Sequence, residues 1–295
     1  MEKRTLGKTG MEVAVLGFGA AEIGYQGVSL PVVDRLLNGA LDAGLNVIDT
    51  AECYINSEEF IGQAVAARRS EYFLFTKCGH DKEGDHWNPN KMAEQMDLSL
   101  RRLKTDRVDL LQLHSCTEEQ LRQGDVMEVA TRARDAGKTR FIGYSGDSRA
   151  ALYAVECGVF DTLQISVNIA DQEGIDMAIP AAQVKGMGVI AKRPIANAVW
   201  KHATKPDAYH RSYWDRLLAL DYNFLKGDFQ NAVSVALRFT LAVPGVHTAI
   251  VGTTQPDRWR QNAELLKAGP LEKRQWEAIR AKWKSVASPE WVGQT

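Results

Sequence analysis

Short runs of aliphatic and aromatic residues recur along the 295-residue chain, and no other feature constrains its fold as strongly. Each run has the length of a strand and is too apolar to leave either face in water, which is typical of parallel sheets covered on both sides. Eight such runs predict eight strands, at residues 13–19, 45–51, 72–78, 108–114, 139–145, 160–166, 188–194 and 247–253.

Amphipathic segments separate most of these runs. In residues 32–44 and 118–137, for example, apolar side chains recur at the i, i+3, i+4 and i+7 spacing of a helix. Because strand and helix alternate throughout, we predict a (β/α)8 TIM barrel that forms one domain over residues 1–295. Residues 4–13, ahead of the first barrel strand, contain the turn sequence Gly-Lys-Thr-Gly and predict a hairpin that plugs the barrel floor.

Composition excludes several classes of partner. The net charge of -1 argues against binding to nucleic acid or to an anionic membrane. The sequence has no apolar run of about 18 residues, and its first residues lack the apolar core of a signal peptide, so we expect a cytoplasmic protein. The four cysteines form no Cys-x-x-Cys pair and the six histidines lack zinc-ligand spacing, which predicts reduced thiols and no metal.

Two segments near the C-terminus are rich in aromatic residues. Residues 195–228 are expected to form either a lid over the active site or an extra surface helix packed by its aromatic side chains. Trp276, Ile279 and Trp283 fit one face of a C-terminal helix lying on the barrel. We expect the rim loops to set the choice of substrate, namely residues 195–228, the loop 80–88 that contains Trp87, and the tail around Trp291.

Four polar residues lie at or just after the C-terminal ends of adjacent predicted strands: Asp49, Tyr54, Lys77 and His114. Taken singly, each has a structural explanation, such as a helix cap, rim packing or a solvated charge. Active sites of (β/α)8 barrels lie at this end of the strands, however, and here three neighbouring strands bring complementary groups to one rim. Together the four residues therefore favour a catalytic site.

The chemistry of these residues points to proton donation. A phenol has an ordinary pKa near 10, so Tyr54 needs a neighbouring cation to release its proton. Lys77 can supply that cation if Asp49 holds it in place, and His114 can orient a carbonyl oxygen beside Tyr54. Because the sequence offers no obvious activated nucleophile, the carbonyl carbon would receive a hydride from a reduced nicotinamide.

Residues 44–54, GLNVIDTAECY, resemble the signature of the aldo-keto reductase family. Residues 16–20, 75–79 and 99–114 agree with that family in order and spacing. The resemblance implies an NAD(P)H-dependent oxidoreductase that acts on a small-molecule aldehyde or ketone. It also implies that Tyr54 is the general acid, that Lys77 and Asp49 tune it, and that His114 orients the substrate.

The resemblance further implies a nicotinamide site at the same rim. Ser145 and Gln164 correspond to the family residues that bind the carboxamide, and the site also includes Gly19, Ala20 and Asp49. This chain departs from the family at Gly146, where Asn is common, and at Lys192 and Arg193, where an aromatic residue is common. The two cationic side chains either lie over the ring or reach the pyrophosphate, with Asn197 nearby, or they solvate the rim.

Residues 252–262 resemble the family segment that binds the adenosine 2′-phosphate and adenine at a helix N-terminus, an anion site because its backbone N–H groups are unpaired. Arg258 matches the arginine that contacts the phosphate, and this match favours NADP, as NADPH, without excluding NAD. The residues that the resemblance assigns to this site are Gly252, Thr253, Thr254, Arg258, Gln261 and Asn262.

Other interpretations fit the sequence less well. A Rossmann fingerprint beginning at Gly17 and Gly19 fails, because its third glycine position is Glu22. The barrel could instead bind NADP as a regulatory or redox-sensing subunit with little turnover, although the four catalytic candidates favour turnover.

Two cysteines lie next to catalytic candidates in the sequence, Cys53 beside Tyr54 and Cys78 beside Lys77. Oxidation of either thiol would inactivate the catalytic site if the thiols are reactive. The alternative is that both are small buried hydrophobes.

Overall fold

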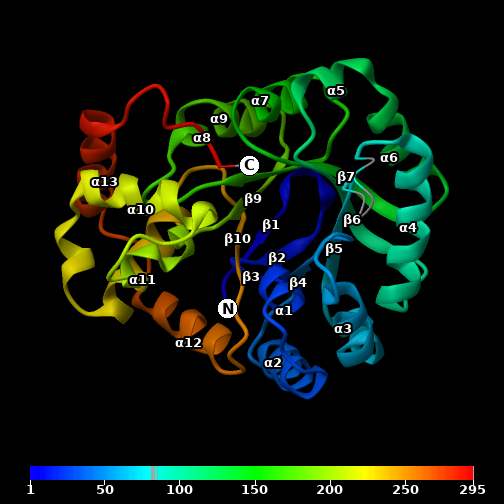
Figure 1. Cartoon of the computed structure of the whole chain (residues 1–295), viewed down its shortest axis with the longest axis horizontal. Coiled ribbons are helices and arrows are strands. Elements are labelled where there is room, and N and C mark those ends of the chain that lie inside the picture. Colours follow the sequence, from blue (N-terminus) through cyan, green and yellow to red (C-terminus); the bar gives the residue numbers. More distant parts are fainter. Residues whose placement is uncertain (81–83, 85, 295) are drawn as a thin grey trace.

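A computed structural model describes residues 1–80, 84 and 86–294. Within these residues eight parallel strands form a closed barrel, which β10 completes by pairing with β3 (Figure 1). The predicted (β/α)8 fold is therefore confirmed. The barrel strands are β3 (Leu16–Gly19), β4 (Val47–Asp49), β5 (Phe73–Cys78), β6 (Val108–His114), β7 (Thr139–Ser145), β8 (Thr162–Ser166), β9 (Gly188–Lys192) and β10 (Thr248–Val251).

Helices surround this barrel, as Figure 1 shows. The first half of the layer contains α1 (Ala21–Tyr25), α2 (Leu30–Asp42), α3 (Ser57–Ala64), α4 (Pro89–Leu103), α5 (Glu118–Gln123), α6 (Asp125–Asp135) and α7 (Ser148–Glu156). The second half contains α8 (Glu173–Asp176), α9 (Ala178–Val184), α10 (Ala208–Leu220), α11 (Phe229–Leu241), α12 (Arg258–Leu265) and α13 (Lys273–Val286). Of the helices in the described part of the chain, none is long and apolar enough to cross a membrane.

An N-terminal hairpin closes the floor of the barrel, as predicted. Its strands are β1 (Lys3–Thr5) and β2 (Glu12–Ala14), and its buried Leu6 packs in the same cluster as the barrel residue Phe75. At Gly7, φ is +51° and a Cβ would lie 2.2 Å from the Gly188 nitrogen, so glycine lets the turn contact the start of β9. The prediction of one strand over residues 13–19 was wrong, because the hairpin ends at Ala14 and the barrel strand begins at Leu16.

Two helix predictions change in detail. Residues 118–137 form two helices, because Gly124 has φ +91° and interrupts the helical path. Residues 195–228 contain α10 and two short 3-10 helices, η3 (Ala196–Lys201) and η4 (Asn223–Lys226). Tyr213 of α10 packs with Ile279 and Trp283 of α13 in a second buried cluster, which confirms the extra packed helix and the predicted apolar face of α13.

Candidate active site

A buried ion pair lies at the C-terminal ends of β4 and β5. The Lys77 ammonium contacts one oxygen of Asp49 and donates to the Thr50 carbonyl oxygen at 2.8 Å, and both charged side chains are almost completely buried. The amides of Gln112 and Gln164 donate to the other Asp49 oxygen at 2.9 and 2.8 Å. The Asp49 carboxylate therefore has a partner for each oxygen, and it holds the Lys77 charge in a fixed position.

Tyr54 lies in the turn that follows β4, above this pair. Gly24 of α1 makes room for the turn, because a Cβ there would lie 2.1 Å from the Tyr54 carbonyl oxygen. The Lys77 ammonium lies 5.1 Å from the centroid of the Tyr54 ring. The ring of His114, at the end of β6, meets the Tyr54 ring edge-on at a centroid distance of 5.6 Å. The four side chains that sequence analysis selected are thus neighbours in space.

The surroundings fix the protonation states of the two rings. Burial raises the pKa of Tyr54 well above 10, the Asp49 charge raises it further, and Arg193 lowers it. Burial and Asp49 outweigh the effect of Arg193, and the role of Lys77 as the cation that tunes the phenol stays a prediction. Burial and the Lys77 charge hold the pKa of His114 well below 6.5. Near neutral pH the site therefore contains a protonated phenol and a neutral imidazole.

Two further ionisable groups lie beside His114. One oxygen of buried Glu52 accepts from the His80 backbone N–H at 2.9 Å, and the Cys53 sulfur lies 3.5 Å from His114 Nδ1. Donor atoms of Glu52, Cys53 and His114 lie within 4.8 Å of one another, close enough to ligate a cation. Burial raises the pKa of Glu52 to about 8 and that of Cys53 to about 12, so a cation would have to displace both protons.

The same shifts bear on thiol chemistry. Burial raises the pKa of Cys53 to about 12 and that of Cys78 well above 9, and a thiol that keeps its proton is a poor nucleophile. The environment of both cysteines therefore argues against the oxidation hypothesis.

The raised pKa of Glu52 predicts that the stability of the folded protein depends on pH. The folded state raises its pKa from 4.5 to about 8, mainly because burial disfavours the carboxylate, so its stabilising contribution is complete at low pH and is lost as pH rises from about 4.5 to 8. The neutral glutamine side chain of Glu52→Gln resembles the protonated carboxyl group of Glu52. We expect the variant to be as stable as the wild type at pH 5 and a few kcal/mol more stable at pH 8.5, since each pKa unit is worth about 1.4 kcal/mol.

Denaturant unfolding at the two pH values measures this difference. The exposed neighbour Glu59→Gln is the matched control, and we expect it to follow the wild type. Parallel stability profiles for the wild type and Glu52→Gln would contradict the assignment.

The candidates for carboxamide binding join the network of Asp49. Ser145 donates to Gln164 Oε1 at 3.1 Å, and the amide nitrogen of Gln164 donates to Asp49. Gly146 has no room for a side chain, because a Cβ would lie 2.4 Å from the Tyr144 hydroxyl. That hydroxyl donates to the Cys116 carbonyl oxygen at 2.7 Å and is fixed in place. The family's usual Asn therefore could not fit at Gly146.

Lys192 and Arg193 both point into the protein, so the alternative that they solvate the rim is wrong. The Lys192 ammonium pairs with Asp147 at 2.9 Å, and burial lowers the pKa of Lys192. Arg193 has φ +55° and donates to the Ser166 hydroxyl at 2.8 Å and to the Tyr209 hydroxyl at 3.1 Å. Sequence analysis missed Asp147 and Ser166, although both are polar residues at the ends of strands.

Asn197 lies one turn after Arg193, in a strained segment. Residues 196–198 all have positive φ, with Asn197 at +54°, a conformation that costs free energy at residues other than glycine. The Asn197 side-chain nitrogen is buried and has no hydrogen-bond partner among the described residues. A buried donor that has no partner in the described part of the chain suits a polar ligand group.

The predicted adenosine segment follows β10. Gly252 makes room for Glu22, because a Cβ there would lie 1.6 Å from a Glu22 carboxyl oxygen. Arg258 is the first residue of α12, and it donates to Gln255 Oε1 at 2.8 Å. Thr253 and Thr254 are partly exposed, Gln261 is exposed and Asn262 is buried.

The other two cofactor candidates, Gly19 and Ala20, lie at the end of β3. Gly19 pairs with Asp49, and the Ala20 N–H donates to the Asp49 carbonyl oxygen.

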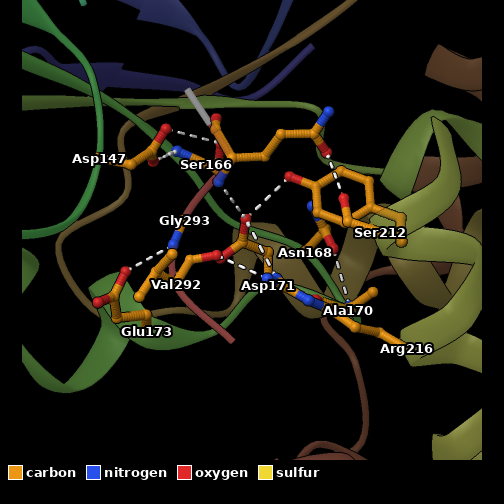
Figure 2. A network of polar contacts seen from close by, with 12 residues as sticks. Asp147, Ser166, Asn168, Ala170, Asp171, Glu173, Ser212, Arg216, Val292 and Gly293 are labelled. Atoms are coloured by element: carbon orange, nitrogen blue, oxygen red, sulfur yellow. Dashed lines mark hydrogen bonds and ion pairs between the residues drawn. The ribbon is translucent and has the colours of Figure 1, made fainter. Parts of the chain in front are cut away.

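The C-terminal tail lies over the ends of β7, β8 and β9, a contact that no local sequence pattern indicates. Figure 2 shows Val292 and Gly293 between Glu173 and Arg216. Arg216 donates to the Val292 carbonyl oxygen at 2.7 Å, and the Gly293 N–H donates to Glu173 at 2.7 Å. A Cβ on Gly293 would lie 2.4 Å from Asp147 Cβ, so the tail fits here only as glycine.

Gln294 continues this tail into the candidate cofactor site. Its carbonyl oxygen accepts from Arg193 and, at 3.3 Å, from the Ser166 hydroxyl. Its backbone N–H donates to Asp171 at 3.3 Å, and burial raises the pKa of Asp171 to about 7. The Gln294 carbonyl oxygen thus occupies donor groups of both Arg193 and Ser166.

The rim loop 80–88 adds two rings to the site, although residues 81–83 and 85 lie outside the described part of the chain. The His80 ring lies 4.9 Å from the His114 ring and 5.6 Å from the Trp87 ring. Gly79 allows this arrangement, because a Cβ there would lie 2.2 Å from the Trp87 indole. The His80 ring therefore lies between the His114 ring and the Trp87 ring.

Comparison with known proteins agrees with this geometry. The model of the Aldo/keto reductase family matches residues 15–284. The chain belongs to this family. The aldo-keto reductase AKR11C1 from Bacillus halodurans, in its holo form, superposes on it with a TM-score of 0.84 at 26% identity over 99% of each chain.

Two curated relatives are named for their activity on sugars or sugar derivatives. L-galactose dehydrogenase from Arabidopsis thaliana is 28% identical over 281 residues, which cover 89% of this aldo/keto reductase and 87% of that protein. 6-dehydroglucose reductase from Novosphingobium aromaticivorans is 25% identical over 297 residues, covering 94% and 93%. Both names describe oxidoreductases, the class to which this family member belongs.

Proposed function

We propose that this protein reduces an aldehyde or ketone to the alcohol with a hydride from NAD(P)H, and that Tyr54 supplies the proton. The observation that carries the proposal is the meeting of Tyr54, His114 and the Lys77–Asp49 pair at the open end of the barrel. The names of the curated relatives suggest aldoses and their keto derivatives as the first substrates to examine.

The raised pKa of Tyr54 is compatible with proton donation. The phenol keeps its proton until the carbonyl carbon is attacked, and the alkoxide that then forms is a stronger base than a phenolate. His114, which is neutral, can donate one hydrogen bond to the carbonyl oxygen and polarise it beside the phenol. The phenolate left after transfer is stabilised by Lys77 and Arg193 and regains a proton from water.

The residues at the rim suit a dinucleotide. When bound, the nicotinamide supplies the hydride. Asn197 offers a buried donor that has no partner among the residues that the structure describes, and Arg193 offers a guanidinium for a phosphate. The N-terminus of α12 offers backbone N–H groups beside Arg258, which suit the 2′-phosphate of NADP. Ser145 and Gln164 are the proposed carboxamide ligands.

The proposal is tested by following NADPH oxidation with a panel of aldehydes, ketones and aldoses. We expect turnover with at least one carbonyl compound. If fluorescence titration shows NADPH binding while no compound in the panel is reduced, the reductase proposal fails and a cofactor-binding regulatory role replaces it.

Arg258 predicts the cofactor preference. Arg258→Ala removes a charge-assisted contact to the 2′-phosphate, so we expect the KM for NADPH to rise about tenfold and the KM for NADH to stay unchanged. The matched control is Arg260→Ala, which removes an exposed arginine of the same helix that pairs with Asp257. Equal effects of Arg258→Ala on both cofactors would contradict the assignment to the 2′-phosphate.

The position of the tail predicts that the Gln294 carbonyl oxygen and NADPH compete for Arg193. Ending the chain after Trp291 frees Arg193 and Ser166 from the Gln294 carbonyl oxygen. We expect NADPH to bind about three- to tenfold more tightly, because the Arg193 guanidinium no longer has to give up its hydrogen bond to the Gln294 carbonyl oxygen. Fluorescence titration measures the change, and the truncation should have no effect in an Arg193→Ala background. Weaker NADPH binding after truncation would mean that the tail belongs to the binding surface instead.

A further inference from the structure

The imidazole of His114 has one polar neighbour that neither the catalytic scheme nor the family resemblance uses. The Cys53 sulfur lies 3.5 Å from His114 Nδ1. Within the described chain, this contact is the one hydrogen bond to the ring, because His80 contacts the backbone oxygen of His114 at 2.7 Å. Cys53 immediately precedes Tyr54, so the turn that positions the phenol also positions the thiol.

A neutral imidazole carries one N–H, and its tautomer decides which nitrogen can donate. Burial is the largest cause of the lowered pKa of His114, and Lys77, His80, Lys192 and Arg193 lower it further. Burial and the neighbouring cations together keep the ring neutral near neutral pH.

The other ionisable groups close to the ring are Tyr54, Glu52 and Cys53, and donor atoms of the last two lie within 4.8 Å of a ring nitrogen of His114. Lys and Arg are donors and cannot accept an N–H of the ring. Glu52 could accept one, but among the described residues no hydrogen bond joins it to the ring, so the choice between the two nitrogens falls to Cys53.

The thiol can make that choice. Burial raises the pKa of Cys53 to about 12, so its sulfur carries a proton near neutral pH. A protonated thiol is a weak donor and its sulfur is a weak acceptor, whereas an unprotonated imidazole nitrogen is a good acceptor. The favoured arrangement is therefore S–H donating to an unprotonated Nδ1.

We propose that Cys53 is a positioning residue that fixes the tautomer of His114: its S–H donates to Nδ1, so the proton of the neutral ring stays on Nε2. The Nε2–H then donates to the substrate carbonyl oxygen. This second step rests on the proposed reductase function, whereas the tautomer itself does not. Nothing is oxidised and no covalent bond forms, because the thiol acts only as a hydrogen-bond donor.

Imidazole 15N NMR of the histidine-labelled wild-type protein tests the tautomer without substrate. We expect His114 to show the Nε2–H form, Cys53→Ala to show a mixture of both tautomers, and Cys53→Ser to recover the Nε2–H form through its hydroxyl. The matched control is Cys157→Ala, which removes a partly buried thiol whose partner is the Ala154 carbonyl oxygen. It should leave the His114 signals unchanged.

Kinetics supply the second measurement. Because Cys53→Ala loses one hydrogen bond, we expect its kcat/KM to fall by about three- to tenfold, with partial recovery in Cys53→Ser. A wild-type Nδ1–H tautomer, or an unchanged tautomer ratio in Cys53→Ala, would overturn the role of Cys53. A wild-type Nε2–H tautomer in a protein that reduces no carbonyl compound would support that role and contradict the reductase function.

Discussion

Replacing Tyr54 with Phe is expected to lower kcat by roughly a hundred- to ten-thousandfold, the range that a positioned general acid contributes. The substitution removes only the hydroxyl, and the ring can keep its edge contact with His114 and its place beside Lys77. Because the phenyl ring still fills the same space, we expect NADPH affinity and thermal stability to stay close to those of the wild type.

A matched substitution separates proton donation from general disturbance of the rim. Tyr25→Phe removes a second hydroxyl nearby, since the Tyr25 ring lies 5.7 Å from the Tyr54 ring and its hydroxyl donates to the Cys53 carbonyl oxygen. We expect less than a tenfold loss of kcat from Tyr25→Phe. Comparable rates for Tyr54→Phe and the wild type would remove Tyr54 from the role of acid.

Lys77→Met is expected to destabilise the fold by about 3–5 kcal/mol, because it leaves the buried Asp49 carboxylate without its cation. Denaturant unfolding measures this loss. The variant should also lose most of its activity, since the phenolate of Tyr54 would lose a stabilising charge.

The double variant Lys77→Met/Asp49→Asn distinguishes the structural effect from the catalytic one. An asparagine at this position is neutral and its carbonyl oxygen can still accept from Gln112 and Gln164, so we expect much of the stability to return. Activity should stay low because the cation is still missing. Recovery of both stability and activity would show that Lys77 serves only the fold.

Strand ends explain why much of the site could be predicted from sequence. Parallel strands place their C-terminal residues at one rim, so Asp49, Lys77 and His114 had to meet once the barrel was predicted. The register confirms this arrangement, with Lys77 beside Gln112 and His114 beside Ser145. A local pattern was sufficient here because the fold itself supplies the long-range proximity.

Other parts of the site had weaker or no local signals. Gln112 lies two residues before His114 and shares its face of β6, but it was hidden in an otherwise apolar run. The contact of Gln294 with Arg193 joins residues 101 positions apart, and no periodicity or motif indicates it. The pKa of Tyr54 depends mainly on its burial, which no local sequence pattern indicates.

The most direct test of the account is the transfer of deuterium from NADPH labelled at the reactive C4 position to a carbonyl substrate. We predict that the alcohol product carries one deuterium on the former carbonyl carbon, as mass spectrometry and NMR would show, and that Tyr54→Phe forms this product at a strongly reduced rate. Oxidation of the labelled cofactor without deuterium in any alcohol product would contradict the proposed hydride transfer.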